Sequence, residues 1–151
     1  MMKRKIYLLL VVLLLTSATA LAQSGLSVDG AFGGRYKKRS DVSEVLLRGK
    51  EAKVYGMTLF RSLKAPGASA IATEIEEMVR RDGKNAVSRS EGAKGGHLYY
   101  AFYELKPVSL AQRRYIFFRN NATAGKKDGT MTLIYIEGPI TKAQIAQRFG
   151  K

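Results

Sequence analysis

The side chains most suited to chemistry in this chain are aromatic and basic rather than nucleophilic. The chain of 151 residues holds no Cys and a single His, His97, which follows two glycines at the start of an expected strand. Nucleophilic catalysis needs a base beside the nucleophile, and a zinc site needs three or four nitrogen, sulfur or oxygen ligands. We therefore expect no catalytic residue, no metal site and no cofactor, and we expect His97 to lie at a sheet edge.

Aromatic side chains gather in two expected strands, residues 97–105 and 113–119, and arginines stand at the ends of the second. An open sheet with exposed rings and Arg is how RNA-recognition domains stack bases. The simpler alternative is that the rings form the core on one face of the sheet, with Tyr on the other. Residues two apart in a strand share a face. The candidate ligand face, for a glycan or an acidic partner, consists of Tyr99, Tyr103, Arg113, Tyr115 and Arg119.

Basic residues dominate the charge. The chain carries 26 Lys and Arg against 12 Asp and Glu, a formal net charge of +14. Such a protein attracts polyanions. The candidate polyanion cluster is one dense run that contains Arg35, Lys37, Lys38 and Arg39. The alternative is a generally basic, soluble surface.

The first 22 residues have the three parts of a secretory signal peptide. Lys3–Lys5 is basic, Ile6–Leu15 is an unbroken apolar run, and Ala20–Ala22 has the small-x-small form of a cleavage site. A membrane-spanning helix needs about 20 apolar residues, so this run is too short to remain as an anchor. We expect cleavage after Ala22, no membrane span afterwards, and a periplasmic or secreted protein.

Export changes the expected partner. The part that remains after cleavage keeps a formal net charge near +11 because only three basic residues leave with the signal. In the cytosol that charge would indicate nucleic acid. Outside it, we expect no nucleic acid, and an anionic envelope component or an acidic protein becomes the better candidate, although the partner itself stays unknown.

The periodicity of the chain predicts an arm and one domain. Residues 23–40, rich in Gly and basic side chains, are expected to form a flexible or loosely docked arm, and residues 41–151 a single domain. Apolar residues at helical spacing predict a helix from Ser69 to Gly83. The other expected elements are short helices at 41–47 and after Thr141, a strand at 51–63, a polar connection at 84–96, and strands at 97–105, 113–119 and 130–137 with a hairpin loop at 120–129. This order predicts an α+β fold with about four mainly antiparallel strands and two or three packed helices.

Three strand motifs carry a family resemblance: Leu59–Leu63, Gly95–Tyr103 and Thr132–Gly138. With them the chain resembles a family of small exported Bacteroidetes proteins classed as a domain of unknown function, over roughly residues 41–149. The resemblance implies an α+β fold and a periplasmic or surface location. It implies no active-site residue, because the motifs are of the kind that fills a core.

These observations favour a non-catalytic exported domain that binds or scaffolds something in the cell envelope. Two alternatives remain open. An envelope hydrolase with an atypical site would be favoured by a deep polar cleft that gathers Glu104, Glu137 or His97. A polyanion-binding protein driven by its basic charge would bind less tightly as salt increases.

Overall fold

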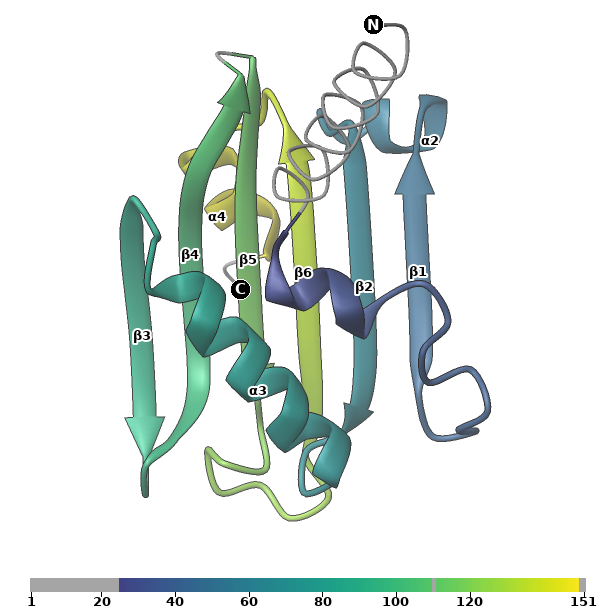
Figure 1. Cartoon of the computed structure of the whole chain (residues 1–151), viewed down its shortest axis with the longest axis vertical. Coiled ribbons are helices and arrows are strands. Elements are labelled where there is room, and N and C mark those ends of the chain that lie inside the picture. Colours follow the sequence, from purple (N-terminus) through teal and green to yellow (C-terminus); the bar gives the residue numbers. More distant parts are fainter. Residues whose placement is uncertain (1–24, 110, 150–151) are drawn as a thin grey trace, which may run out of the picture.

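One antiparallel sheet of six strands, in the order β1-β2-β6-β5-β4-β3, forms the middle of the molecule (Figure 1). The computed structural model describes residues 25–109 and 111–149. Its elements, in chain order, are the 3₁₀ helix η1 (Ser27–Ala31), β1 (Ser43–Arg48), α2 (Lys50–Lys53), β2 (Leu59–Pro66), α3 (Ala70–Gly83), β3 (Ser88–Lys94), β4 (His97–Ser109), β5 (Gln112–Asn120), β6 (Thr130–Gly138) and α4 (Lys142–Phe149). Within those residues no helix is both long and apolar enough to cross a bilayer.

Each face of the sheet has its own core. Successive side chains of a strand point to opposite faces, and in the central strands both sets are largely apolar. On one side, here called the α3 face, Ile116 and Leu133 are buried beneath Ile75 of α3. On the other, here called the α4 face, Tyr115 and Ile136 are buried with Ile145 of α4. Figure 1 shows α3 and η1 in front of the sheet and α4 behind it.

Helix α3 confirms the strongest helix prediction. The Ser69 side chain caps its first turn, since Oγ accepts a hydrogen bond from the Ala72 N–H at 3.2 Å. Such a cap satisfies one of the unpaired N–H groups at a helix start. The predicted apolar stripe faces the sheet, with Ile75 and Val79 fully buried, and the helix ends at Gly83.

Helix α4 is short and covers only part of its face. Thr141 and Gln144 cap it reciprocally: the Gln144 N–H donates to Thr141 Oγ1 at 3.3 Å, and the Thr141 N–H donates to Gln144 Oε1 at 2.8 Å. This is a capping box, and it confirms the helix predicted after Thr141. Among the α4 side chains that the structure describes, Ile145 alone is buried. Eight residues reach about 12 Å, so α4 cannot span a six-stranded sheet.

The protein is α+β in broad kind, as expected, but the expected sheet of about four strands is wrong. The strands predicted at 97–105, 113–119 and 130–137 are confirmed as the meander β4-β5-β6, each slightly longer than expected. Strand β4 continues past Pro107, where its pairing with β5 is interrupted between Leu105 and Ser109. A proline is tolerated there because no ladder hydrogen bond requires its missing N–H.

The helix expected at residues 41–47 is wrong, because this stretch forms β1 at the sheet edge. Asp41, just before the strand, forms an ion pair with Arg39. Gly49 has φ of +61° in the turn after the strand. Helix propensity is a weak preference that tertiary contacts override, and here pairing with β2 along the whole strand decides the conformation.

Two further predictions are corrected. The strand expected at 51–63 is the helix α2 followed by β2, and Gly56 lies in the turn between them with φ of +77°. The polar connection expected at 84–96 contains β3, the other edge strand. Most side chains of β3 are exposed. It therefore has no apolar alternation, which is the pattern by which a strand is recognised in a sequence.

The described part of the segment 23–40 packs on the domain. Val28 has no exposed surface, and Phe32 is also buried in the α3-face core. The carboxylate of Asp82, near the end of α3, accepts hydrogen bonds from the N–H groups of Ser27 and Val28 at 2.8 and 2.9 Å. Burial raises the pKa of Asp82. The expected signal peptide, residues 1–22, lies outside the described residues.

Close packing between α3 and β4 predicts that one methyl group added at Gly83 lowers the stability of the fold. A Cβ at Gly83 would lie 2.5 Å from Cε2 of Tyr103, whereas a Cβ at Gly30 would meet nothing closer than 3.6 Å. We expect Gly83→Ala to lower the free energy of unfolding by about 1–3 kcal/mol through overpacking, and Gly30→Ala to change it by less than about 0.5 kcal/mol. Chemical denaturation of both variants measures this. Equal stability of the two would contradict the described packing.

Candidate functional site

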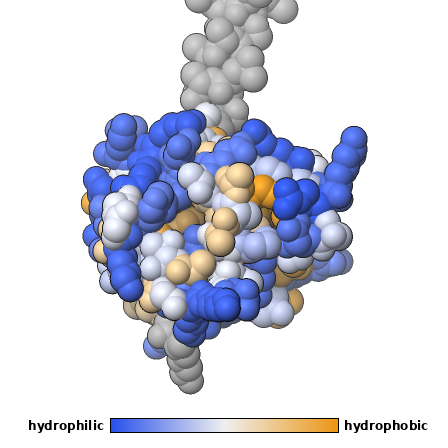
Figure 2. All heavy atoms as spheres, turned by 90° about the horizontal axis from the view of Figure 1, so that it is seen from below, coloured by the Kyte–Doolittle hydropathy of each residue, from blue (hydrophilic) through white to orange (hydrophobic). Residues whose placement is uncertain are grey.

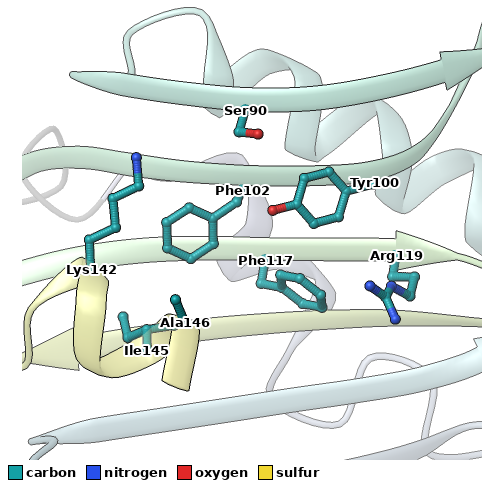
Figure 3. A pocket seen from close by; sticks show the side chains of 8 residues that line it. All are labelled: Ser90, Tyr100, Phe102, Phe117, Arg119, Lys142, Ile145 and Ala146. Atoms are coloured by element: carbon teal, nitrogen blue, oxygen red, sulfur yellow. The ribbon is translucent and has the colours of Figure 1, made fainter. Parts of the chain in front are cut away.

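A groove of about 310 Å³ lies on the α4 face, between one flank of α4 and the strands β3, β4 and β5 (Figure 3). Its lining residues are Ser90, Tyr100, Phe102, Phe117, Arg119, Lys142, Ile145 and Ala146. The volume is at the lower end of the range for small-molecule sites, about 300–1,000 Å³. The groove exists because α4 leaves this part of the sheet uncovered.

Strand register brings the aromatic side chains of the groove together. Phe102 of β4 is directly opposite Phe117 of β5, and Tyr100 is opposite Arg119. The rings of Tyr100 and Phe117 meet edge to face, with centroids 5.8 Å apart and an interplanar angle of 76°. Both are partly exposed, so apolar ring surface is available to a ligand.

Two cations stand at opposite ends of this row of rings, as Figure 3 shows. Lys142 Nζ donates a hydrogen bond to Ser88 Oγ at 3.0 Å and lies 5.9 Å from the centroid of the Phe102 ring. The guanidinium carbon of Arg119 lies 5.7 Å from the centroid of Phe117. Neither cation forms an ion pair within the residues described. Cation–π contacts contribute about 0.5–1 kcal/mol at exposed sites, so they orient the cations without neutralising them.

Charges are distributed unequally over the two faces. The ion pairs found among residues 25–109 and 111–149 lie on the α3 side or in the loop before β1, for example Arg80–Glu76 and Arg61–Asp29. By strand alternation, Glu104 is the one described strand carboxylate that points to the α4 face. The cations on that face therefore have few internal partners and are available to an external anion.

Tyr115 supports the groove from below. Its ring stacks on Phe102 with centroids 5.9 Å apart, and its hydroxyl donates a hydrogen bond to the Ile140 carbonyl at 2.9 Å. Burial raises the pKa of Tyr115, so the hydroxyl remains a donor. The bond fixes the chain just before α4 and thereby the position of Lys142.

The residues of the candidate ligand face are divided between the two sides. Tyr103 is buried on the α3 face, where its hydroxyl donates a hydrogen bond to Glu91, and Tyr115 is buried on the α4 face. Tyr99 is 38% exposed and its ring lies against Gly92. Arg113 shares the α4 face with Arg119, but of these residues only Arg119 lines the groove.

Several groove residues are absent from the sequence-based candidates, namely Ser90, Tyr100, Phe102, Phe117, Lys142, Ile145 and Ala146. Alternation within each strand correctly groups Phe117 with Arg119, and Tyr100 with Phe102. The missing information is the register between β4 and β5, which places even-numbered residues of one strand beside odd-numbered residues of the other. Register depends on pairing in three dimensions.

The candidate polyanion cluster is partly neutralised. Arg35 forms an ion pair with Glu74 of α3, and Arg39 forms one with Asp41. Lys37 and Lys38 are exposed. The run that is densest in the sequence therefore offers fewer available charges than its composition indicates.

The polar residues of the hydrolase alternative do not share a cleft. Glu104 points to the α4 face, and Glu137 accepts a hydrogen bond from Tyr135 on the α3 face. His97 is the first residue of β4, and its Nδ1 lies 3.3 Å from the buried Glu76 carboxylate. The same carboxylate accepts from the Leu98 N–H and pairs with Arg80 of its own helix, so it joins α3 to the start of β4. In the described residues no three His, Cys, Asp or Glu side chains are placed to bind a metal ion.

A second hollow of about 390 Å³ lies at the C-terminal end of α4, lined by Leu47, Tyr55, Met57, Phe60 and Arg148. Arg148 is the one charged residue of this lining, and its guanidinium carbon lies 5.9 Å from the centroid of the Tyr55 ring, so the hollow offers fewer charged contacts than the groove. The end of the molecule that carries the loop between β5 and β6 is mainly hydrophilic, with small scattered apolar areas (Figure 2). The groove that contains Arg119 and Lys142 is therefore the better candidate.

The protein is an α+β domain with one six-stranded sheet and helices on both faces. A groove lined by aromatic and basic side chains lies beside α4, which covers only part of its face of the sheet. The chain belongs to a family of unknown function, DUF6108, whose family model matches residues 15–149. The resemblance to a domain of unknown function is thereby confirmed, while a Bacteroidetes origin stays a prediction. No curated protein and no solved structure matches the chain.

The hydrogen bond from Tyr103 to Glu91 predicts a pH-dependent contribution to stability. The Tyr103 hydroxyl holds the pKa of Glu91 below its usual value. Because the folded pKa is lower than the unfolded one, this contribution is present above the unfolded pKa of about 4.3 and is lost as the pH falls through the folded pKa. We expect Tyr103→Phe to lower the free energy of unfolding by about 1 kcal/mol at neutral pH, and by less at about pH 3.

Urea denaturation of wild type and variant across this pH range measures the difference. Tyr115→Phe is the matched control, since its hydroxyl donates to a backbone carbonyl, which does not titrate in this range. A Tyr103→Phe difference that stays constant from neutral to acidic pH would show that Glu91 is not the titrating partner.

Proposed function

We propose that this protein is an exported, non-catalytic binding domain that takes an anionic ligand with a flat or extended apolar body into the groove beside α4. One observation carries the proposal: three aromatic rings lie between Arg119 and Lys142, and neither cation has a carboxylate partner in the described residues. The rings suit the apolar body, and each cation suits a carboxylate, sulfonate or phosphate.

The polar groups of the groove narrow the ligand class. Besides the two cations, Ser90 and the Tyr100 hydroxyl are the hydrogen-bonding side chains that line it. A neutral sugar would need several such partners, because each buried hydroxyl left unpaired costs about 1–3 kcal/mol. An amphipathic anion needs only one or two polar contacts at its charged end, so the groove favours it.

A charged and a neutral form of one probe test this proposal. We expect 8-anilinonaphthalene-1-sulfonate to bind more tightly than N-phenyl-1-naphthylamine, which has the same rings without the sulfonate. Arg119→Gln and Lys142→Gln should each weaken sulfonate binding about three- to tenfold, equivalent to about 1 kcal/mol, and leave the neutral probe unchanged. Phe117→Ala should weaken both probes, since it removes ring surface. Fluorescence titration measures all of these affinities.

Lys64→Gln is the matched control, because Lys64 is an exposed cation on the same face but outside the groove. It should leave both affinities unchanged. Equal binding of the two probes, or equal effects of Lys64→Gln and Arg119→Gln, would reject the groove as an anion site.

Export is the second part of the proposal, and the sequence of the first 22 residues supports it. A basic start, an apolar run of ten residues and Ala20–Ala22 occur in the order that signal peptidase requires. Expressed with its own leader in a bacterial host, the protein should have the intact mass of residues 23–151. Replacing both Ala20 and Ala22 by Arg should block cleavage. An unmodified chain whose mass still includes residues 1–22 after fractionation would contradict the proposal.

A further inference from the structure

The two edges of the sheet differ in how they are protected. Along β3 the edge carries charged side chains, and its pairing with β4 is interrupted by a bulge between Gly92 and Ala93. Charges and bulges of this kind prevent a strand edge from pairing with another chain. Along β1 the register with β2 is unbroken, and Val45 and Leu46 are 48% and 43% exposed on opposite faces.

We propose that β1 pairs antiparallel with β1 of a second copy of this chain, across a two-fold axis that passes beside Leu46. The two six-stranded sheets would then join edge to edge. The proposal is independent of the groove, which lies on β3–β5 toward the opposite edge of the sheet.

Strand geometry limits the possible registers. Residues directly opposite each other in an antiparallel pair point to the same face. Leu47 belongs to the α4-face core, so Val45 points to that face too, whereas Glu44, Leu46 and Arg48 point to the α3 face. A two-fold arrangement centred on β1 therefore places either Val45 or Leu46 opposite its own copy.

Charge complementarity selects the register centred on Leu46. In that register Glu44 is opposite Arg48 of the second copy, and this ion pair occurs twice because of the symmetry. Val45 is opposite Leu47 of the second copy, so the apolar side chains also meet. In the register centred on Val45, Glu44 would be opposite Leu46, and no ion pair would form.

Both charged residues are placed for this role. The Glu44 carboxylate accepts hydrogen bonds from the N–H groups of Gly33 and Gly34 at 2.8 and 3.1 Å, which orient it at the strand edge. Arg48 is exposed and forms no ion pair within the described residues. One strand that carries both halves of the pair at symmetric positions is complementary to itself, which favours a second copy over a foreign strand.

The absence of Cys makes a direct test possible, because a single introduced thiol is unique in the chain. Directly opposite residues have Cα atoms about 4.5–5.5 Å apart, within the range for a disulfide of about 4.4–6.8 Å. Under mild oxidation, Leu46→Cys should give a covalent dimer on a non-reducing gel. Val45→Cys, similarly exposed but opposite Leu47, is the matched control and should remain mostly uncrosslinked.

Charge reversal tests the ion pair without a crosslink. Arg48→Glu places two carboxylates opposite each other and should weaken dimerisation about tenfold or more in sedimentation velocity. Glu44→Arg combined with Arg48→Glu should restore much of the association, because the two charges are exchanged. Far-UV circular dichroism of each variant shows whether the fold is retained.

Three results would overturn the proposal. They are a purified protein that stays monomeric up to about 1 mM, a Val45→Cys crosslink that forms more readily than the Leu46→Cys crosslink, and a dimer that Arg48→Glu leaves unchanged. The Arg119→Gln variant should still dimerise, because Arg119 is not part of the β1 interface. A failure of the groove as a ligand site would therefore leave the β1 dimer unaffected.

Discussion

The central strands bury apolar side chains on both faces, and every helix position depends on this constraint. Tyr115 and Ile116 are neighbours in β5 that point to opposite sides, and both are almost fully buried. Each face therefore needs a cover. Helix α3 and η1 supply an extensive one, whereas α4 supplies a short one that buries Ile145. The groove occurs where α4 ends and part of the sheet is left uncovered. The candidate site therefore exists because α4 is shorter than the sheet is wide.

Amphipathic and apolar segments were predictable from the sequence because each carries its own periodic signal. The stripe containing Ile75 and Val79 predicts α3, and the apolar runs of β4, β5 and β6 predict a meander. The candidate site was only partly predictable. Arg119 was named, but its partners Tyr100 and Phe102 depend on a register that no single strand encodes. Lys142 reaches the groove from a helix far along the chain.

The two edge strands were missed for different physical reasons. Strand β3 is polar and exposed, so it lacks the alternation of a half-buried strand. In β1, Val45, Leu46 and Leu47 are apolar in succession, which fits a short helix as well as a strand. Its conformation is decided by the ladder with β2, from Ser43 opposite Lys64 to Arg48 opposite Leu59. Edge strands are thus the elements whose identity depends most on a neighbour and least on their own residues.

The unequal placement of charge has a consequence for the molecule as a whole. Carboxylates such as Glu76 and Asp82 belong to α3, while Lys64, Arg119 and Lys142 lie on the opposite side of the sheet. The positive charge of the α4 face is therefore less offset by neighbouring carboxylates than the positive charge of the α3 face, where the basic residues form ion pairs. A positive field of this kind raises the encounter rate with anions. Near an anionic surface, the cations of the α4 face would be attracted toward that surface without first having to break an internal ion pair.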